Sequence, residues 1–453
     1  MSRSQKSTRP TAKPRERVLV CGVLMPGQAE EHDGPLSELR ELLRASDVEP
    51  IGSGIVQRKD TPDPATLMGK GKVAEIAAEV ELLEPDAVAV DNDLSPAHIR
   101  NLEKAWGVRV LDRSEVILDI FARRARTSQA RLQVELAQAE YLLPRLKRMW
   151  THLERMEGAV GTRGPGETQL ETDKRLLRKR VQDLKRELEG IAERRQREVR
   201  SRSDQFTVGL VGYTNAGKST LLNRLTGAEE LAADMLFATL DTRTRQWRLP
   251  DSRAVLLSDT VGFLQRLPHH LVASFQATLA ETLHADLLLH VVDASHPDAS
   301  TQLEAVDRVL DEFAWTDRRE VLVFNKIDRV PEPLSLHSLA VGRKNEVVFV
   351  SAVTGEGLGR LTELVMRELD SRAITARLRV PLADGRSAAL ARASGGVQSE
   401  ELVGEESLTL VLKLSQGSLG NLRRSLGAAV EVEILGGGRD VSERTLAGER
   451  RGR

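Results

Sequence analysis

The sequence predicts an α/β protein of several domains, in which a mostly parallel sheet with helices on both faces is joined to a second α/β domain and a small α+β domain. The chain has 453 residues, which is too long for one ordinary domain. Short apolar runs alternate with helical patterns in two separate stretches, 17–125 and 206–370, and such alternation favours parallel sheets. Hydrophobic residues make up 40% of the chain, enough to form the cores of these domains.

Composition narrows the class of protein. Cys21 is the single cysteine, which excludes an internal disulfide framework and fits a reducing cytosol. Aromatic residues are only 3%, which argues against a lectin-like binder. The best apolar run, Leu287–Val292, ends at Asp293, far short of the roughly 20 residues that span a bilayer. The polar start of the chain is not a signal peptide. We therefore expect a cytoplasmic protein without a membrane anchor, and peripheral association with a membrane stays open.

Charge is unevenly distributed. Between Phe121 and Asp204 the chain has 21 Lys/Arg and 13 Asp/Glu, a net of +8, although the formal net charge of the whole chain is -1. Two interpretations stay open for this basic stretch: a solvated helix face, or a surface that binds nucleic acid.

The N-terminal part is expected to be a flexible basic tail, 1–16, followed by an α/β domain over 17–125. The expected strands are Arg17–Leu24, Ile51–Gln57, Ala87–Asp91 and Val108–Leu111. The expected helices are Leu36–Ala45, Lys72–Leu83, Pro96–Trp106 and Ser114–Ala125.

Residues 126–204 are expected to form a long helical hairpin. Apolar residues recur at helical spacing along both arms: Leu132, Leu136, Ala139 and Leu143 in the first, and Leu177, Val181, Leu184, Leu188 and Ile191 in the second. Between the arms lies Gly158–Glu167, whose four glycines and one proline predict a loop at the tip that continues neither helix.

A phosphate-binding loop is predicted directly after the apolar strand Phe206–Val211. The pattern Gly-x-x-x-x-Gly-Lys-Ser lies between this strand and an apolar helix, which is the context in which it binds a nucleotide. Backbone N–H groups and a helix N-terminus favour an anion there. We expect Lys218 to bridge the β- and γ-phosphates and Ser219 to hold Mg²⁺. The expected loop residues are Gly212, Tyr213, Thr214, Asn215, Ala216, Gly217, Lys218, Ser219 and Thr220.

The base is predicted to be guanine. The buried-strand run Val321–Phe324 leads into Asn-Lys-Ile-Asp, at the carboxyl end of a strand, where α/β proteins bind ligands. A carboxylate at Asp328 can accept two hydrogen bonds from guanine that adenine cannot supply, each worth about 1.5–3 kcal/mol. The expected base contacts are Asn325, Lys326, Ile327, Asp328, Ser351, Ala352 and Val353.

Two switch segments are predicted between these motifs. The first comprises Phe237, Ala238, Thr239, Leu240 and Asp241. The second comprises Asp259, Thr260, Val261 and Gly262. Mg²⁺ is expected to be held by Ser219, Thr239 and, through water, Asp259; the expected catalytic residues are Lys218, Thr239 and Gly262. Five elements in the right order predict a GTP-hydrolysing domain over 205–372.

Two residues of this domain bear on its rate. Many GTPases have a water-orienting glutamine after the switch-II glycine, whereas this chain has Phe263, so slow turnover that waits for a partner or a cation is expected. Asn215 has two open interpretations: a ligand of K⁺, or a residue that braces the loop.

The segment 373–436 has the order strand, helix, two strands, helix, strand, and predicts a small α+β domain. Residues 437–453 are expected to be a disordered tail.

The motifs together resemble the HflX family of translational GTPases over about residues 17–370. The residues that carry the resemblance are Lys70–Lys72, Val110–Arg113, Leu132–Gln138, Gly161–Glu171, Phe237–Asp241 and Asp259–Phe263. The sequence departs from the family in Thr242, where proline is expected, and in its basic tail. The resemblance implies a GTP/GDP-binding protein that binds the large (50S) ribosomal subunit and splits or rescues stalled ribosomes, often under stress.

The same resemblance implies that the hairpin reaches toward the peptidyl-transferase region. The glycine-rich tip of the hairpin suits a close approach to folded rRNA. Its binding should depend on the shape of the RNA and on the salt concentration rather than on base sequence. The expected rRNA contacts are Gly161, Arg163, Gly164 and Gly166. Off the ribosome a monomer is expected.

Other functions fit the residues less well. A factor for 50S assembly would use the same parts and stays open. An RNA-binding protein with a dead nucleotide site is disfavoured, because Lys218, Ser219, Thr239 and Asp259 are all intact. A metabolic kinase has no use for the base motif, and a membrane-signalling GTPase would need a lipidation motif that the C-terminus lacks.

Overall fold

The computed structural model describes residues 15–26, 34, 36–146, 165–201, 205–228, 237, 243–251, 253–260, 262–264, 285–312, 319–330, 345–404 and 406–437. The chain divides into two compact units. One comprises Met1–Arg186, Met235–Phe237 and Leu267–Ser274, and the other comprises Glu187–Asp234, Ala238–Arg266 and Phe275–Arg453. Their folds are α/β, as predicted.

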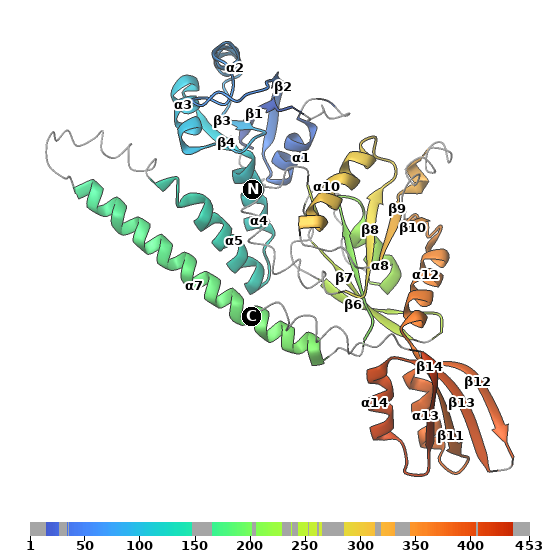
Figure 1. Cartoon of the computed structure of the whole chain (residues 1–453). Helices are drawn as coiled ribbons and strands as arrows, with labels where there is room; N and C mark the ends of the chain where they lie inside the picture. The colour runs from blue at the N-terminus through green and yellow to red at the C-terminus, as the bar shows by residue number, and fades with distance from the viewer. Residues whose placement is uncertain are drawn as a thin grey trace, which may run out of the picture. The chain divides into compact units, whose positions relative to one another are not determined.

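The first unit contains a parallel sheet of order β2-β1-β3-β4 (Figure 1). Its strands are β1 (Arg17–Leu24), β2 (Glu49–Arg58), β3 (Ala87–Val90) and β4 (Arg109–Asp112), and its helices are α1 (Ser37–Ala45), α2 (Lys70–Leu83), α3 (Pro96–Trp106) and α4 (Arg113–Arg124). The helix α3 has the predicted bounds because its signals are local: Ser95 caps its start, proline occupies its first turn, and Gly107 ends it in a left-handed conformation with φ 73°.

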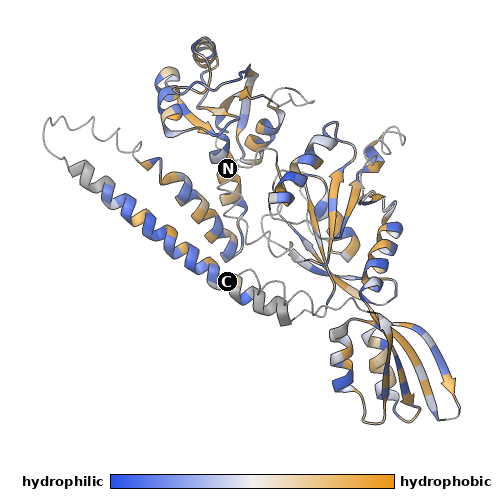
Figure 2. Ribbon diagram, viewed as in Figure 1, coloured by the Kyte–Doolittle hydropathy of each residue, from blue (hydrophilic) through white to orange (hydrophobic). Residues whose placement is uncertain are grey.

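The helices α5 (Ser128–Leu142) and α7 (Pro165–Ser201) follow. The predicted stripe on α7 faces inward, with Leu184 fully buried. Ion pairs join the two helices, from Arg180 to Glu135 at 2.7 Å and from Lys185 to Glu140 at 2.8 Å. Figure 2 shows the described part of α7 as mostly hydrophilic, which fits a helix that buries one narrow side.

The prediction for the end of the loop was wrong. The segment Gly158–Glu167 was expected to continue neither helix, but α7 begins at Pro165 and includes Gly166 and Glu167. Proline is tolerated in the first turn of a helix, where its missing N–H needs no partner, and an acidic residue there favours the helix dipole. Residues 147–164, which include Gly161, Arg163 and Gly164, lie outside the described residues.

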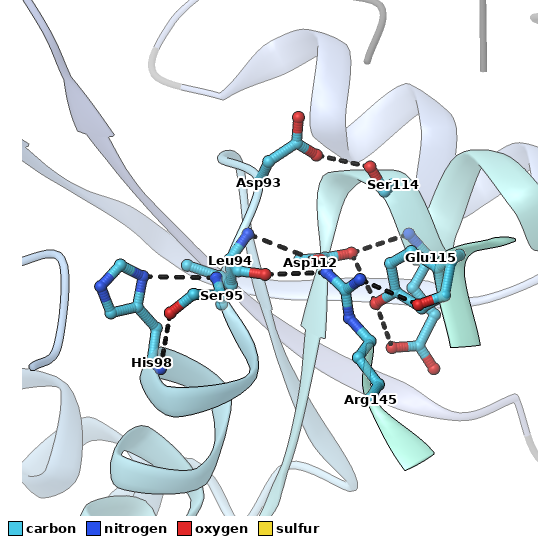
Figure 3. Close-up of polar contacts among 9 residues, drawn as sticks. Asp93, Leu94, Ser95, His98, Asp112, Ser114, Glu115 and Arg145 are labelled. Atoms are coloured by element: carbon cyan, nitrogen blue, oxygen red, sulfur yellow. Dashed lines mark hydrogen bonds and ion pairs between the residues drawn. The ribbon is translucent and has the colours of Figure 1, made fainter. Parts of the chain in front are cut away.

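A polar cluster joins α5 to the carboxyl edge of the N-terminal sheet (Figure 3). The carboxylate of Asp112, fully buried, accepts hydrogen bonds from the Glu115 N–H at 2.8 Å and the Tyr141 hydroxyl at 3.0 Å. Its other oxygen pairs with Arg145 Nη2 at 3.0 Å, and the same guanidinium donates to the carbonyl of Leu94. The end of α5 is therefore fastened to the loop after β3 and to the last residue of β4.

The second unit contains a six-stranded sheet of order β10-β9-β8-β5-β7-β6, in which β6 runs antiparallel to β7 and the other pairings are parallel. Its strands are β5 (Thr207–Gly212), β6 (Arg243–Arg248), β7 (Ala254–Asp259), β8 (Leu287–Asp293), β9 (Glu320–Asn325) and β10 (Glu346–Phe349). Its helical segments are α8 (Lys218–Thr226), α10 (Ala299–Glu312), the 3-10 turn η1 (Ile327–Arg329) and α12 (Leu358–Ser371). The chain leaves β5 at the point where the strand order reverses, which is where open α/β sheets bind ligands.

The C-terminal α+β fold is the predicted one. It comprises β11 (Ile374–Pro381), α13 (Gly385–Ser394), β12 (Gly396–Val403), β13 (Ser407–Leu414), α14 (Gln416–Ser425) and β14 (Glu431–Gly437). Its sheet is antiparallel, of order β12-β13-β11-β14. Asp370 at the end of α12 accepts from Lys413 on β13 at 3.2 Å and from Arg253, beside β7, at 2.6 Å. Within the described residues, no helix combines the length and the apolar character needed to cross a membrane.

Candidate nucleotide-binding site

The predicted phosphate loop connects the end of β5 to the start of α8. Gly217 precedes α8 in a left-handed conformation with φ 90° and offers no side-chain cap to the first turn of the helix. Asn215 is also left-handed, with φ 61°, and is exposed. The backbone of this loop therefore forms an anion-binding concavity at a helix N-terminus.

Two glycines are required by close contacts. A Cβ at Gly217 would lie 2.3 Å from Nδ2 of Asn325, and one at Gly262 would lie 2.7 Å from Cα of Thr214. No side chain fits at either place, so the base-recognition segment and switch II can both approach the phosphate loop.

Lys218 is buried beneath this loop. Its ammonium donates to the carbonyls of Gly212 at 3.0 Å and Tyr213 at 2.7 Å. Burial lowers the pKa of Lys218 to about 8; the nearby Asp259 carboxylate opposes this shift and Lys326 adds to it. The two carbonyls thus hold the side chain in place in the free protein.

Two of the three expected metal ligands lie together. The Ser219 hydroxyl donates to Oδ2 of Asp259 at 2.6 Å, and Asp259 is fully buried at the end of β7. Hard cations such as Mg²⁺ prefer oxygen ligands of this kind, so the donor set fits the ion. Thr239 lies outside the described residues, as do Ala238, Leu240 and Asp241.

Switch II continues the sheet alongside the phosphate loop. The Thr214 N–H donates to the carbonyl of Phe263 at 2.7 Å, and the Phe263 N–H donates to the carbonyl of Gly212 at 3.1 Å. The Phe263 side chain is buried. Thr260 donates to the carbonyl of Leu210 at 2.7 Å from a buried position, and Val261 lies outside the described residues. The residue in the usual place of the glutamine therefore packs inward.

Phe237, at the start of the predicted switch I, is also buried. Its ring meets that of Phe121 on α4 edge to face, with centroids 4.6 Å apart, inside the first compact unit. Phe237 therefore packs against Phe121, and its described ring contact is with that residue and not with the phosphate loop.

The base-recognition segment follows β9 and is braced on both sides. Asn325 Nδ2 donates to the carbonyl of Ala216 at 2.9 Å, and its Oδ1 accepts from the Ala352 N–H at 3.0 Å. The Ser351 hydroxyl donates to Oδ1 of Asp328 at 2.5 Å. Ile327 packs into the core below, whereas Val353 is exposed. Polar groups from the segments after β9 and β10 thus meet beside the phosphate loop.

One residue of this edge was not predicted. Asp293, the last residue of β8, pairs with the ammonium of Lys326 at 2.6 Å. The sequence showed it only as the end of an apolar run. Its signal is the position itself, a carboxylate at the carboxyl end of a strand next to the strand that carries the base motif.

Sequence comparisons with known proteins point the same way. Three family models match the chain. They are described as GTP-binding GTPase N-terminal, over residues 33–122, GTP-binding GTPase Middle Region, over 124–202, and 50S ribosome-binding GTPase, over 207–326. The chain is 47% identical to GTPase HflX of Magnetococcus marinus, over 80% of this chain and 83% of that one. It is 46% identical to GTPase HflX of Escherichia coli K12, over 78% and 83%. A solved GTP-binding protein from Sulfolobus solfataricus in complex with GDP is 22% identical, with TM-score 0.41, over 78% of this chain and 98% of that one.

Proposed function

The chain belongs to the GTPase HflX family and is a GTP hydrolase with a domain of the 50S ribosome-binding class, and from this premise we propose that it splits or rescues stalled and idle 70S ribosomes under stress. The observation that carries the proposal is the hairpin of α5 and α7, a basic arm attached to a GTPase. It works in the cytoplasm, as a monomer when free.

The surface of the arm supports this proposal. Exposed basic side chains follow the outer side of α7, and include Arg175, Arg178, Lys179 and Arg186. Several basic groups along one helix bind phosphates without reading a base sequence, which suits a folded RNA surface. The residues proposed to contact rRNA at the tip are Gly161, Arg163, Gly164 and Gly166.

GTP binding and hydrolysis at the nucleotide site are proposed to drive the splitting reaction and to time it. In the proposed arrangement Lys218 holds the β- and γ-phosphates, Asp328 reads guanine, and Ser219, Thr239 and Asp259 hold Mg²⁺. The ion, when bound, neutralises charge that develops on the phosphates. Gly262 presents its N–H to the γ-phosphate, so that loss of this phosphate releases switch II.

Turnover is proposed to be slow until a partner binds. The buried Phe263 side chain cannot orient the attacking water. The ribosome therefore completes the site, either by ordering the switches or together with a K⁺ ion held by the exposed Asn215. Equal turnover in sodium and potassium buffers would exclude the K⁺ contribution.

A sedimentation experiment tests the proposed reaction. Purified 70S ribosomes are incubated with the protein and GTP, and free subunits are measured on sucrose gradients. The proposal expects more free 50S and 30S subunits than with GDP. No increase would contradict splitting, and would favour the alternative role in 50S assembly.

A further inference from the structure

The base-recognition segment contains three polar side chains, and each is held from outside the segment. Asn325 is held by the phosphate loop and Asp328 by Ser351. Lys326 is held by Asp293, through an ion pair of 2.6 Å in which both side chains are mostly buried, at 14% and 12% exposure. Asp293 belongs to none of the motifs that predicted the site.

The backbone explains how Asp293 reaches this place. Asp293 and Asn325 are register partners at the ends of the parallel strands β8 and β9. Oδ1 of Asp293 accepts from the Ser295 N–H at 3.0 Å and from its hydroxyl at 2.6 Å, which fixes the carboxylate on its own turn. Oδ2 is then left directed at Lys326.

Lys326 has a conformation that needs support. It is left-handed, with φ 64°, which is unfavourable for a residue with a Cβ by roughly 1–2 kcal/mol. Its stem passes the phosphate loop, since a Cβ at Gly217 would lie 3.9 Å from Cε of Lys326. With the ammonium bound to Asp293 at its far end, the stem presents an apolar strip beside the phosphate loop.

The ammonium of Lys326 is largely buried and needs a partner. Pairing it with the Asp293 carboxylate is less unfavourable than burying an unpaired charge.

We propose that Asp293 is a positioning residue for guanine nucleotides: it holds the Lys326 ammonium so that the lysine stem forms the wall on which the flat base rests. The inference depends on nucleotide binding and not on the ribosome, so a failure of the splitting experiment leaves it untouched. If the lysine stem moves, a ligand with a base should lose affinity, whereas a ligand without a base should keep its affinity.

The variant Asp293→Asn tests this directly. Asparagine keeps a carbonyl oxygen for Ser295 and replaces the charged acceptor that faces Lys326 with an amide NH2 group, which only donates. GDP binding by the full chain, measured by calorimetry, is expected to weaken about 10-fold, the scale of one charge-assisted contact. Inorganic pyrophosphate, which has no base, is expected to bind as it does to the unaltered protein, and Asp293→Glu is expected to recover most of the GDP affinity.

A second variant separates positioning from general support of the fold. Lys326→Met removes the ammonium without touching the turn of Asp293, and is expected to weaken GDP binding by a similar factor. In that background Asp293→Asn should add less than about 2-fold, because the two residues act as one unit. Asp286→Asn is the matched control, since Asp286 pairs with Arg372 just before the other end of β8 and is expected to leave GDP affinity unchanged.

The outcomes divide cleanly. A loss confined to GDP that disappears in the Lys326→Met background supports the proposal. Unchanged GDP affinity in Asp293→Asn, an equal loss for pyrophosphate, or full additivity of the two substitutions would overturn it.

Discussion

Single side chains at the nucleotide edge are held by partners in the protein rather than by the ligand. Lys218 rests on two carbonyls of the phosphate loop, and Asp328 rests on Ser351. Such bracing lowers the entropy that is lost on binding. It also makes the state of each group in the free protein measurable.

Lys218 is expected to take up a proton when GDP binds above neutral pH. Burial sets the pKa of Lys218 at about 8 in the free protein, so about half of the molecules are neutral there at pH 8. Phosphate beside the ammonium raises this pKa again. The enthalpy of GDP binding should then depend on the ionisation enthalpy of the buffer at pH 8 and not at pH 6.5. Independence at both pH values would show that Lys218 keeps its proton throughout.

Asp328→Asn is expected to change which base is bound. In the proposed arrangement the carboxylate accepts two hydrogen bonds from guanine, so its loss should weaken GDP binding at least about 100-fold. The new amide can donate to the carbonyl that xanthine has in place of the amino group, so XDP should bind better than GDP. Competition between the two diphosphates measures this; an unchanged preference for GDP would remove Asp328 from base recognition.

Elements are joined by polar contacts between residues far apart in the sequence. The clearest is the fastening of α5 to the N-terminal sheet by Asp112 and Arg145 (Figure 3), to which the Tyr141 hydroxyl adds a hydrogen bond. Burial, the largest effect, raises the pKa of Asp112 to about 6, and the Arg145 guanidinium partly offsets it. The Glu115 N–H also favours the charged form, and Arg145 supplies the positive charge that pairs with it.

Arg145→Met is expected to destabilise the N-terminal unit in a pH-dependent way. A raised carboxyl pKa favours the protonated form in the folded state, so stability from this group is lost as pH rises through about 6. Above that pH the variant leaves an unpaired buried charge, at a cost of about 3 kcal/mol. At pH 5 the cost should be smaller, because Asp112 is protonated.

Hydrogen exchange of the β3 and β4 amides in urea at pH 5 and pH 7.5 measures this difference, with each rate corrected for pH. Arg180→Met is the control, since its pair with Glu135 is exposed and should contribute less than about 1 kcal/mol at either pH. A pH-independent cost for Arg145→Met would contradict the account.

How far the sequence could predict these elements depended on how local the signals were. The helix α3 was predicted to the residue from its caps, and the nucleotide motifs could be placed by spacing alone. The start of α7 was predicted wrongly because the proline, like the glycines, was taken to break the helix, whereas α7 begins at Pro165. The pairs Asp293–Lys326 and Asp112–Arg145 each join residues 33 positions apart through strand register and helix packing, and no sequence pattern expresses those.

At the scale of the whole molecule, the proposal joins a GTPase that is slow alone to a basic hairpin that meets the ribosome. Nucleotide binding and ribosome binding then use different residues, so variants should separate them. A variant at the predicted tip of the hairpin should affect ribosome binding, and a variant in the phosphate loop should affect nucleotide binding.

Arg163→Ala is expected to leave GTP hydrolysis by the free protein unchanged and to lower its stimulation by 50S subunits several-fold. The loss of one phosphate contact should also reduce the salt dependence of 50S binding by about one unit of slope. Arg123→Ala, on α4, is the control. Stimulation that survives Arg163→Ala intact would show that the loop is not the contact.

The most direct test of the central claim is the rate of GTP hydrolysis with and without 50S subunits, at matched Mg²⁺ and K⁺ concentrations. The account predicts slow turnover by the protein alone and a rise of at least about 10-fold with 50S, abolished by Lys218→Ala. Fast turnover without ribosomes, or a rate that 50S subunits leave unchanged, would contradict it.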